Sequence, residues 1–212
     1  MTPPRAVLLD LDRTLVDVET FVDYGAAVAD LAAAGLLATA ADVTADTSWG
    51  SATVQAMDAL VARAGDDRWA EASDLVAAHE LVGAAEARPM PGLDRFLAAL
   101  AGRPLAVVTL LSAEATHRVL ADAGITVDAV VPRRPDLRPK PAPDQVVAAL
   151  EELGMAPADA VMVGDSERDE AAARTAGVAF VGLTNGRDDS HFAPPTTVVT
   201  DLVAAIPVVT AD

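Results

Sequence analysis

The first apolar run of the chain, residues 6–9 (Ala-Val-Leu-Leu), is followed by two carboxylates two positions apart, Asp10 and Asp12. A continuous apolar run of this length is typical of a buried strand, where a carboxylate would have to give up its hydration. The pattern therefore predicts a strand that stops at these two residues. Two acidic residues at the end of a buried strand indicate a site.

Between residues 93 and 183, apolar strand-like segments alternate with segments of helical periodicity. Helices are predicted at about 93–101, 113–123, 144–153 and 167–176, and strands at 105–109, 128–131, 160–163 and 178–183. The tail adds the segment 197–200 and a short helix from about residue 201. This alternation over short connections predicts an α/β fold with a Rossmann-like, doubly wound parallel sheet. Such sheets bind ligands at the carboxyl ends of their strands.

Residues 17–87 differ in character from the rest of the chain. They are rich in alanine, leucine and acids, contain no proline, and carry apolar residues at helical spacing, with breaks predicted at Gly50 and at residues 65–67. The segment 88–92 (Arg-Pro-Met-Pro-Gly) marks the return to the alternating pattern. The sequence therefore predicts a core domain of residues 1–16 and 88–212 with an inserted, all-helical cap subdomain of residues 17–87.

Polar residues follow the predicted strands at intervals along the whole chain. Asp10 and Asp12 end the first strand, Thr109 ends the second, Lys140 lies after the third, and Asp165 follows the fourth. All of these positions fall on the same edge of a doubly wound sheet. Two carboxylates, a hydroxyl, an ammonium and a further acid meeting at one edge indicate an active site much more specifically than any one of them does.

Composition excludes several classes of function. The formal charge of −17 and the pI near 4.3 argue against a nucleic-acid-binding surface, because polyanions would be repelled. The chain has no cysteine, so thiol chemistry and disulfides are excluded. The amino-terminal residues lack the apolar core of a signal peptide, and no apolar segment reaches the roughly 18 residues of a membrane span. We therefore expect a soluble, cytoplasmic protein with no membrane partner.

Of the 15 basic residues, Lys140 is the single lysine. A compact ammonium and a planar guanidinium differ as phosphate partners, so a lysine kept in a chain that otherwise uses arginine suggests a position where arginine would not serve.

Four segments of the chain together resemble the haloacid dehalogenase-like hydrolase superfamily. They are residues 10–14 (Asp-Leu-Asp-Arg-Thr), 107–109 (Val-Val-Thr), 140–144 (Lys-Pro-Ala-Pro-Asp) and 163–169 (Val-Gly-Asp-Ser-Glu-Arg-Asp). The resemblance covers about two thirds of the chain, in the family's order, and the helical insert lies where the family places a small cap. It resembles most the phosphatase branch that includes phosphoglycolate phosphatase and beta-phosphoglucomutase. Arg13 stands where glycine is commonest in the family.

The residues indicate a chemistry of their own. Ionised Asp10 can attack phosphorus as a nucleophile and form an aspartyl phosphate, and Asp12 can protonate the leaving oxygen and later accept a proton from water. The two carboxyl groups then need different environments. An anion attacking a phosphate also needs cationic help, from Lys140 and from a hard divalent ion.

The resemblance implies that the ion is Mg²⁺. Its ligands would be Asp10, the backbone carbonyl of Asp12, and Asp165, with support from Asp169, while Thr109 would bind a phosphate oxygen. The function expected is Mg²⁺-dependent hydrolysis of a small phosphomonoester, a phosphorylated short acid or sugar. The sequence leaves the oligomeric state open.

Other reactions of the family fit less well. A 2-haloacid dehalogenase would not need Asp12, because halide leaves without a proton, and a phosphonatase uses a cap lysine that residues 17–87 lack. A phosphomutase of the beta-phosphoglucomutase type uses the same core residues and stays as the alternative. A phosphoaspartate signalling module would carry its aspartate after a later strand, and a binding protein without catalysis would be expected to lose a motif residue.

Several residues also have structural interpretations. Ser166 and Asp169 fit a helix capping box, Thr109 fits a strand, and Ser112 fits an N-cap better than a phosphate ligand. The three histidines share no metal-like spacing, and Tyr24, Trp49 and Trp69 are expected to pack. The cap carries 13 acids and 2 arginines, so we expect it to disfavour polyanions unless Arg63, Arg68 or Arg88 faces the cleft.

Overall fold

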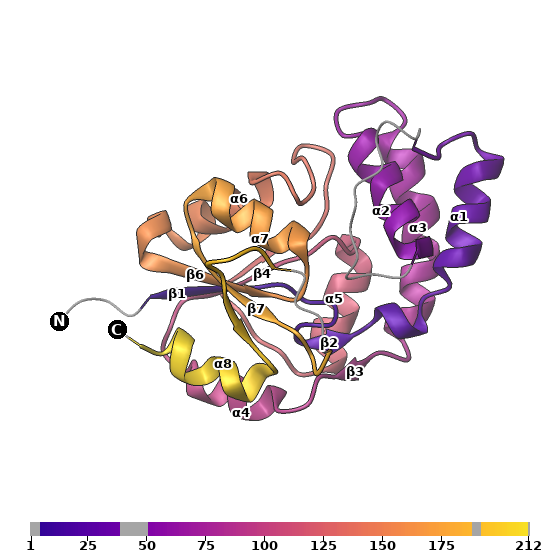
Figure 1. The fold of residues 1–212 in the computed structure, drawn as a ribbon. Helices are drawn as coiled ribbons and strands as arrows, with labels where there is room; N and C mark the ends of the chain where they lie inside the picture. Colours follow the sequence, from indigo (N-terminus) through magenta and orange to yellow (C-terminus); the bar gives the residue numbers. More distant parts are fainter. Residues whose placement is uncertain (1–4, 39–50, 188–191, 212) are drawn as a thin grey trace.

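The computed structural model describes residues 5–38, 51–187 and 192–211. In this part of the chain, parallel strands form a six-stranded sheet in the order β5-β4-β1-β6-β7-β8 (Figure 1). The strands are β1 Ala6–Leu9, β4 Leu105–Val108, β5 Ala129–Val131, β6 Ala160–Gly164, β7 Ala179–Leu183 and β8 Thr197–Val199. Because β1 lies in the middle, the chain builds outward from it in both directions, which confirms the doubly wound sheet.

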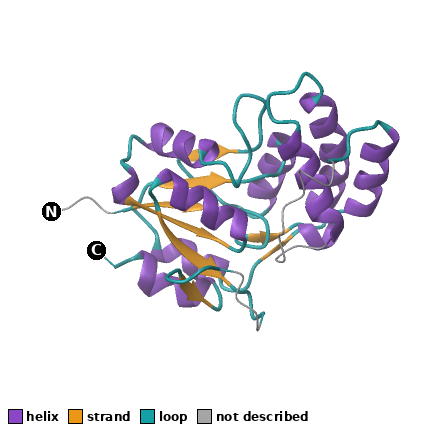
Figure 2. Ribbon diagram, turned by 45° about the horizontal axis from the view of Figure 1, so that its top comes forward, coloured by secondary structure: helices purple, strands orange, loops and turns teal. Residues whose placement is uncertain are grey.

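Helices cover both faces of this sheet (Figure 2). Alternate residues of β1 point to opposite faces, as the pleat requires. Val7 and Leu9 pack in the cluster that includes residues of α4, α5 and α8, while Ala6 and Leu8 pack against α6 and α7. The bounds are α4 Leu93–Ala99, α5 Ala113–Asp122, α6 Asp144–Leu153, α7 Glu167–Ala176 and α8 Leu202–Val209. They lie within about two residues of the sequence predictions.

The insert folds into helices that pack against one another at one end of the sheet (Figure 1). They are α1 Tyr24–Ala33, α2 Ser51–Ala62 and α3 Trp69–Ala84, preceded by the short 3-10 helix η1 Glu19–Phe21. Gly65 has φ +83° in the turn between α2 and α3, which confirms the predicted break there. Trp69 is buried, as expected of a packing residue, whereas Trp49 and Gly50 lie outside the described residues.

Two short antiparallel strands lie where the chain leaves the sheet and where it returns. They are β2 Val16–Asp17 and β3 Arg88–Pro89, in which Val16 pairs with Pro89 and Asp17 with Arg88. They coincide with the boundaries expected from the sequence at residues 16/17 and 87/88. The division into core and cap domains itself stays a prediction.

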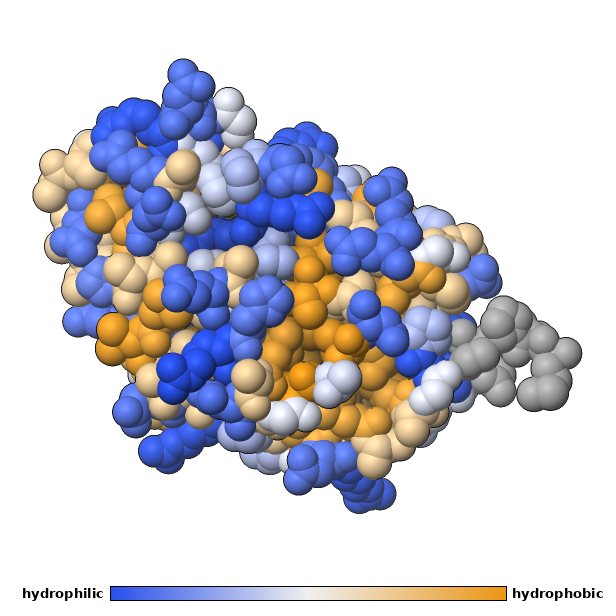
Figure 3. Space-filling view, turned by 180° about the vertical axis from the view of Figure 1, so that it is seen from behind, coloured by the Kyte–Doolittle hydropathy of each residue, from blue (hydrophilic) through white to orange (hydrophobic). Residues whose placement is uncertain are grey.

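On the back of the molecule, hydrophilic side chains cover much of the insert, and apolar residues gather near the middle of that face (Figure 3). Among the helices that the structure describes, none combines the length and the hydropathy that crossing a membrane requires.

Of the histidines, His79 binds Asp30 at the surface with 2.8 Å between Nε2 and Oδ2, and His117 is exposed; His191 lies outside the described residues.

Candidate active site

Four side chains from separate segments meet at the carboxyl edge of the sheet. Asp10, Thr109 and Asp165 each come one residue after their strand, β1, β4 and β6. Lys140 reaches the same place from the loop before α6, and all four side chains are buried. The structure thus brings together the residues that the alternation placed on one edge. Their roles in a reaction stay predictions.

Lys140 is the centre of this cluster. Its Nζ donates to Asp10 Oδ1 at 2.7 Å, to Asp169 Oδ1 at 2.5 Å and to the carbonyl oxygen of Val108 at 2.9 Å. An ammonium has three donors, so these partners use its full capacity. Burial opposes the charged form, but the Asp10 and Asp169 carboxylates outweigh it and raise the pKa of Lys140 above its ordinary value. Lys140 is therefore a fixed positive charge.

Three carboxylates form a candidate cation site beside this lysine. One oxygen each of Asp10, Asp165 and Asp169 lie within 4.8 Å of one another. Burial raises the pKa of Asp10 to about 7, with the Asp169 charge adding to the shift and Lys140 opposing it, and burial also raises the pKa of Asp165 well above its ordinary value. Buried carboxylates with raised pKa values gain most from a divalent ion, which takes hard oxygen ligands.

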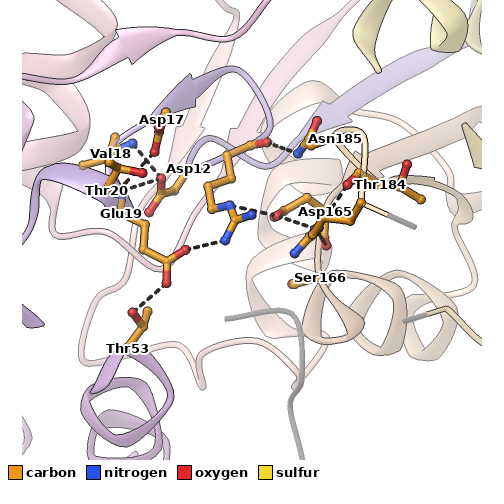
Figure 4. Close-up of polar contacts among 12 residues, drawn as sticks. Asp12, Asp17, Val18, Glu19, Thr20, Thr53, Asp165, Ser166, Thr184 and Asn185 are labelled. Carbon is orange, nitrogen blue, oxygen red and sulfur yellow. Dashed lines mark hydrogen bonds and ion pairs between the residues drawn. The ribbon is translucent and has the colours of Figure 1, made fainter. Parts of the chain in front are cut away.

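Asp12 lies in a different environment from Asp10. Its Oδ1 accepts hydrogen bonds from the backbone N–H of Val18 at 2.8 Å and of Glu19 at 2.9 Å (Figure 4). Burial raises the pKa of Asp12 to about 8, although these two hydrogen bonds oppose the shift. One carboxyl group is thus held by an ammonium and the other by backbone amides. This is the kind of separation that lets two acidic residues hold different protonation states.

The Asp169 carboxylate binds two neighbours, Ser166 and Lys140. Its Oδ2 accepts from the hydroxyl of Ser166 at 2.6 Å and from the Ser166 N–H at 3.2 Å, which completes the capping box of α7, while its Oδ1 binds Lys140. A Cβ placed on Gly164 would lie 2.7 Å from the Asp169 side chain. Glycine at position 164 therefore lets the Asp169 carboxylate approach the strand end closely. The capping interpretation is confirmed, and the same carboxylate also contacts Lys140, while its metal-supporting role stays a prediction.

Thr109 and Ser112 take the places expected of them. Ser112 is the N-cap of α5 and accepts from the N–H of Ala115 at 3.4 Å. The Thr109 hydroxyl oxygen accepts from the N–H of Leu111 at 3.2 Å, next to Asp10 and Lys140 in the wall of the same pocket. The phosphate-binding role of Thr109 stays a prediction.

The insert closes this pocket from the side opposite the sheet. Its lining combines Asp10, Asp12, Thr109, Leu110, Leu111 and Lys140 from the core with Tyr24, Thr53 and Met57 from the helices of the insert. The cavity measures about 20 Å³, which is about the space of one water molecule. Tyr24 was expected only to pack; it is buried, and it also lines the pocket.

Comparison with known proteins places this arrangement in a family. The family described as haloacid dehalogenase-like hydrolase matches residues 4–177, most of the chain. The chain belongs to the haloacid dehalogenase-like hydrolase family. The resemblance found in the sequence motifs is thereby confirmed.

Individual curated relatives match this hydrolase over only part of its chain. It is 39% identical over 112 residues to phosphoglycolate phosphatase of Neisseria meningitidis, covering 48% of this chain and 45% of the relative. It is 38% identical over 71 residues to a protein of Pseudomonas putida named "Probable phosphoglycolate phosphatase", covering 32% of this chain and 28% of the relative. The chain thus spans less than half the length of these two relatives. A hydrolase of known structure from Pseudomonas syringae shares its fold at a TM-score of 0.73, with 20% identity and 97% of each chain covered.

Two arginines at the site were not found by sequence reasoning. Arg187 Nη2 lies 3.2 Å from Asp165 Oδ2, and Arg13 Nε lies 3.7 Å from the same oxygen. In the sequence, Arg13 stands out only as a replacement for a common glycine, and its φ of +58° explains why glycine suits that position. Arg187 comes from a polar loop after β7 with no motif around it, so the sequence carries no signal for it.

Proposed function

We propose that this hydrolase is a Mg²⁺-dependent phosphatase that cleaves a small phosphomonoester, a phosphorylated short acid or sugar, through an aspartyl-phosphate intermediate. The observation that carries the proposal is the placement of Asp10. Its carboxylate lies 2.7 Å from the Lys140 ammonium and next to the carboxylates of Asp165 and Asp169, while Asp12 stands apart on backbone amides. A nucleophile, a fixed cation, a cation site and a separate acid are the parts that phosphoryl transfer to a carboxylate requires.

The first half of the reaction forms a bond to Asp10. Its carboxylate oxygen attacks phosphorus, the bond from phosphorus to the ester oxygen breaks, and Asp12 gives its proton to the departing alcohol. The pKa of Asp12, raised to about 8 by burial, keeps a proton on this group near neutral pH. Lys140 balances the negative charge of the phosphoryl group, and the Thr109 hydroxyl binds one of its oxygens.

The second half releases phosphate. Asp12, now ionised, accepts a proton from a water molecule, whose oxygen attacks phosphorus and breaks the bond to Asp10. Inorganic phosphate leaves, and both carboxyl groups return to their starting states. The proton that Asp12 gave to the alcohol is thus replaced by one from water.

The carboxylates suit a divalent ion. Asp10, Asp165 and the backbone carbonyl of Asp12 would hold Mg²⁺, with Asp169 in support, and an all-oxygen donor set is the one that this ion prefers. When bound, the ion supplies positive charge that screens the repulsion between the nucleophile and the phosphate.

The two relatives named as phosphoglycolate phosphatases support a phosphorylated small molecule as the substrate of this chain as well. We include in the proposal a core of residues 1–16 and 88–212, a cap of residues 17–87 over the site, and a cytoplasmic location.

The test is release of phosphate from 4-nitrophenyl phosphate, with and without Mg²⁺, by the wild type and by Asp10→Asn. We expect the substitution to abolish turnover, because an amide is not a nucleophile toward phosphorus. Asp94→Asn, at an exposed position of α4, is the matched control and keeps the wild-type rate. Equal rates for the wild type and Asp10→Asn would refute the assignment of Asp10.

A further inference from the structure

The side of the pocket that the insert forms is uncharged. Its lining residues are Tyr24, Thr53 and Met57, and all three are buried. The Thr53 hydroxyl donates to Glu19 Oε1 at 2.6 Å, so its hydrogen already points to a carboxylate (Figure 4). The leaving alcohol of a phosphomonoester bound at Asp10 would face this wall, because the opposite wall is occupied by the groups that hold the phosphoryl group.

The arginines of the insert do not line this wall. Arg63 binds the carbonyl oxygens of Gly35 and Leu36 and forms an ion pair with Asp66. Arg68 pairs with Glu71 and binds the carbonyl oxygen of Ala34. Both arginines are thus engaged at the outer end of the insert.

Arg88 follows the insert, and its Cζ lies 5.2 Å from the centre of the Phe21 ring. It is also not among the residues that line the pocket. Residues 39–50 and 188–191, outside the described ranges, contain neither lysine nor arginine. Among the lining residues of the described chain, Lys140 is the one cation.

Two carboxylates lie close to this wall, because Glu19 accepts from Thr53 and Glu80 lies near Tyr24. Burial raises the pKa of Tyr24 well above its ordinary value; nearby Glu80 and Asp12 add to the shift, Arg133 opposes it, and Glu19 adds a smaller contribution. The cations closest to these carboxylates are already paired, Arg133 with Glu80 and Arg13 with Glu19. A second anionic group on the substrate would thus lose its water at this wall and, among the lining residues that the structure describes, find no cation of the insert to pair with.

We infer that this enzyme selects monoesters of uncharged alcohols and discriminates against esters whose alcohol carries a carboxylate or a second phosphate, with Met57 as the side chain that faces the leaving alcohol. The inference rests on the proposed phosphatase function and narrows it. Of the two classes proposed above, it favours the phosphorylated sugar over the phosphorylated short acid, and it disfavours the bisphosphates that a phosphomutase handles.

The test compares esters that differ in one charged group. Ethyl phosphate is paired with 2-phosphoglycolate, and glycerol 3-phosphate with 3-phosphoglycerate, and kcat/KM is measured for each with Mg²⁺ by phosphate release. We expect the uncharged member of each pair to be preferred by at least about tenfold, since desolvating an unpaired carboxylate is unfavourable. Preference for the acid in both pairs would overturn the inference.

Met57→Lys supplies the missing cation with a side chain of similar length, and Met57→Leu is its uncharged control. The lysine variant should raise the ratio of acid to uncharged ester by about tenfold or more over the wild type, and the leucine variant should leave that ratio unchanged. A ratio taken within one variant does not depend on how much of the protein folds. An unchanged ratio in Met57→Lys would contradict the assignment of Met57, and the wild-type comparison stands even if this variant does not fold.

Cleavage of 4-nitrophenyl phosphate distinguishes failure of the substrate inference from failure of the proposed function. If the wild type cleaves 4-nitrophenyl phosphate but prefers the acids, or cleaves none of the four esters, the substrate inference is wrong and the phosphatase function stands. If 4-nitrophenyl phosphate is not cleaved either, the proposed function itself fails.

Discussion

Arg133 Nη1 lies 2.5 Å from Glu80 Oε1, and both side chains are buried, so that an ion pair joins α3 of the insert to the loop after β5. Arg133 also donates to the hydroxyl and carbonyl oxygens of Ser73 in α3, at 2.9 and 2.8 Å, and to the carbonyl oxygen of Leu110. The second oxygen of Glu80 accepts from the N–H of Ser112. This network fixes the insert on the core next to the pocket.

Replacing Glu80 should destabilise the protein strongly. Glu80→Ala leaves Arg133 buried without its carboxylate, and breaking a buried ion pair in this way costs about 3–5 kcal/mol. Urea denaturation measures the free energy of unfolding. The control is Glu71→Ala, which removes the exposed partner of Arg68 and should leave stability almost unchanged. If both variants lost a similar amount of unfolding free energy, the buried ion pair would stabilise the protein no more than the exposed one.

Gly164→Ala should reduce activity through Asp169. The added methyl group would lie 2.7 Å from the Asp169 side chain, which must move and so weaken its bond to Lys140. Overpacking of this kind costs about 1–3 kcal/mol of stability, and we expect kcat to fall at least about tenfold. Gly25→Ala, where the methyl group meets only the exposed Asp23 carboxylate, is the control. Wild-type kcat in Gly164→Ala would mean that the position of Asp169 is not needed.

Asp12→Asn should separate the two halves of the reaction. A 4-nitrophenolate group leaves without needing a proton, so the variant can still form the aspartyl phosphate from 4-nitrophenyl phosphate, but it has no base to activate water. Rapid mixing should show a burst of about one nitrophenolate per enzyme molecule, followed by slow turnover. Asp10→Asn should show no burst. Absence of a burst in Asp12→Asn, with the protein folded, would contradict the division of roles.

The stability of the metal-free protein should depend on pH through Asp10. Burial raises its pKa from 3.8 to about 7, so the folded state holds this proton more tightly than the unfolded state does. The stability from this group is present below about pH 4 and lost as the pH rises through 7. In EDTA, Asp10→Asn should therefore gain stability relative to the wild type between about pH 5 and pH 8.

Added Mg²⁺ should cancel most of that gain by stabilising the wild type, because the ion replaces the proton on Asp10. Thermal or urea unfolding with and without the ion measures both effects. A difference between the two proteins that stays constant with pH would refute the raised pKa.

The sequence predicts the edge of the sheet well and the wall of the insert poorly. Asp10 and Asp165 directly follow buried strands, and parallel strands that alternate with helices place their carboxyl ends on one side, so their meeting follows from the pattern alone. Met57 and Thr53 carry no such signal. Whether they face the pocket depends on how α2 is rotated and docked, and this is decided by contacts distant in sequence, such as the pairing of Asp58 with Arg168.

Asp169 shows a different limit. The sequence offered a helix cap and a site residue as alternatives, because a pattern of residue types does not say what each of the two oxygens binds. The structure gives one oxygen to Ser166 and the other to Lys140. Arg187 was beyond prediction for another reason, since it reaches Asp165 from a loop that has no regular periodicity.

Because Lys140 is the single lysine of the chain and its side chain is 2% exposed, the protein carries a built-in chemical reporter. An amine-reactive acylating reagent has one lysine side chain to modify, and that side chain is shielded and triply hydrogen-bonded. The labelling rate of this one lysine, followed by mass spectrometry, would therefore report how well burial and its carboxylate partners protect it from the reagent.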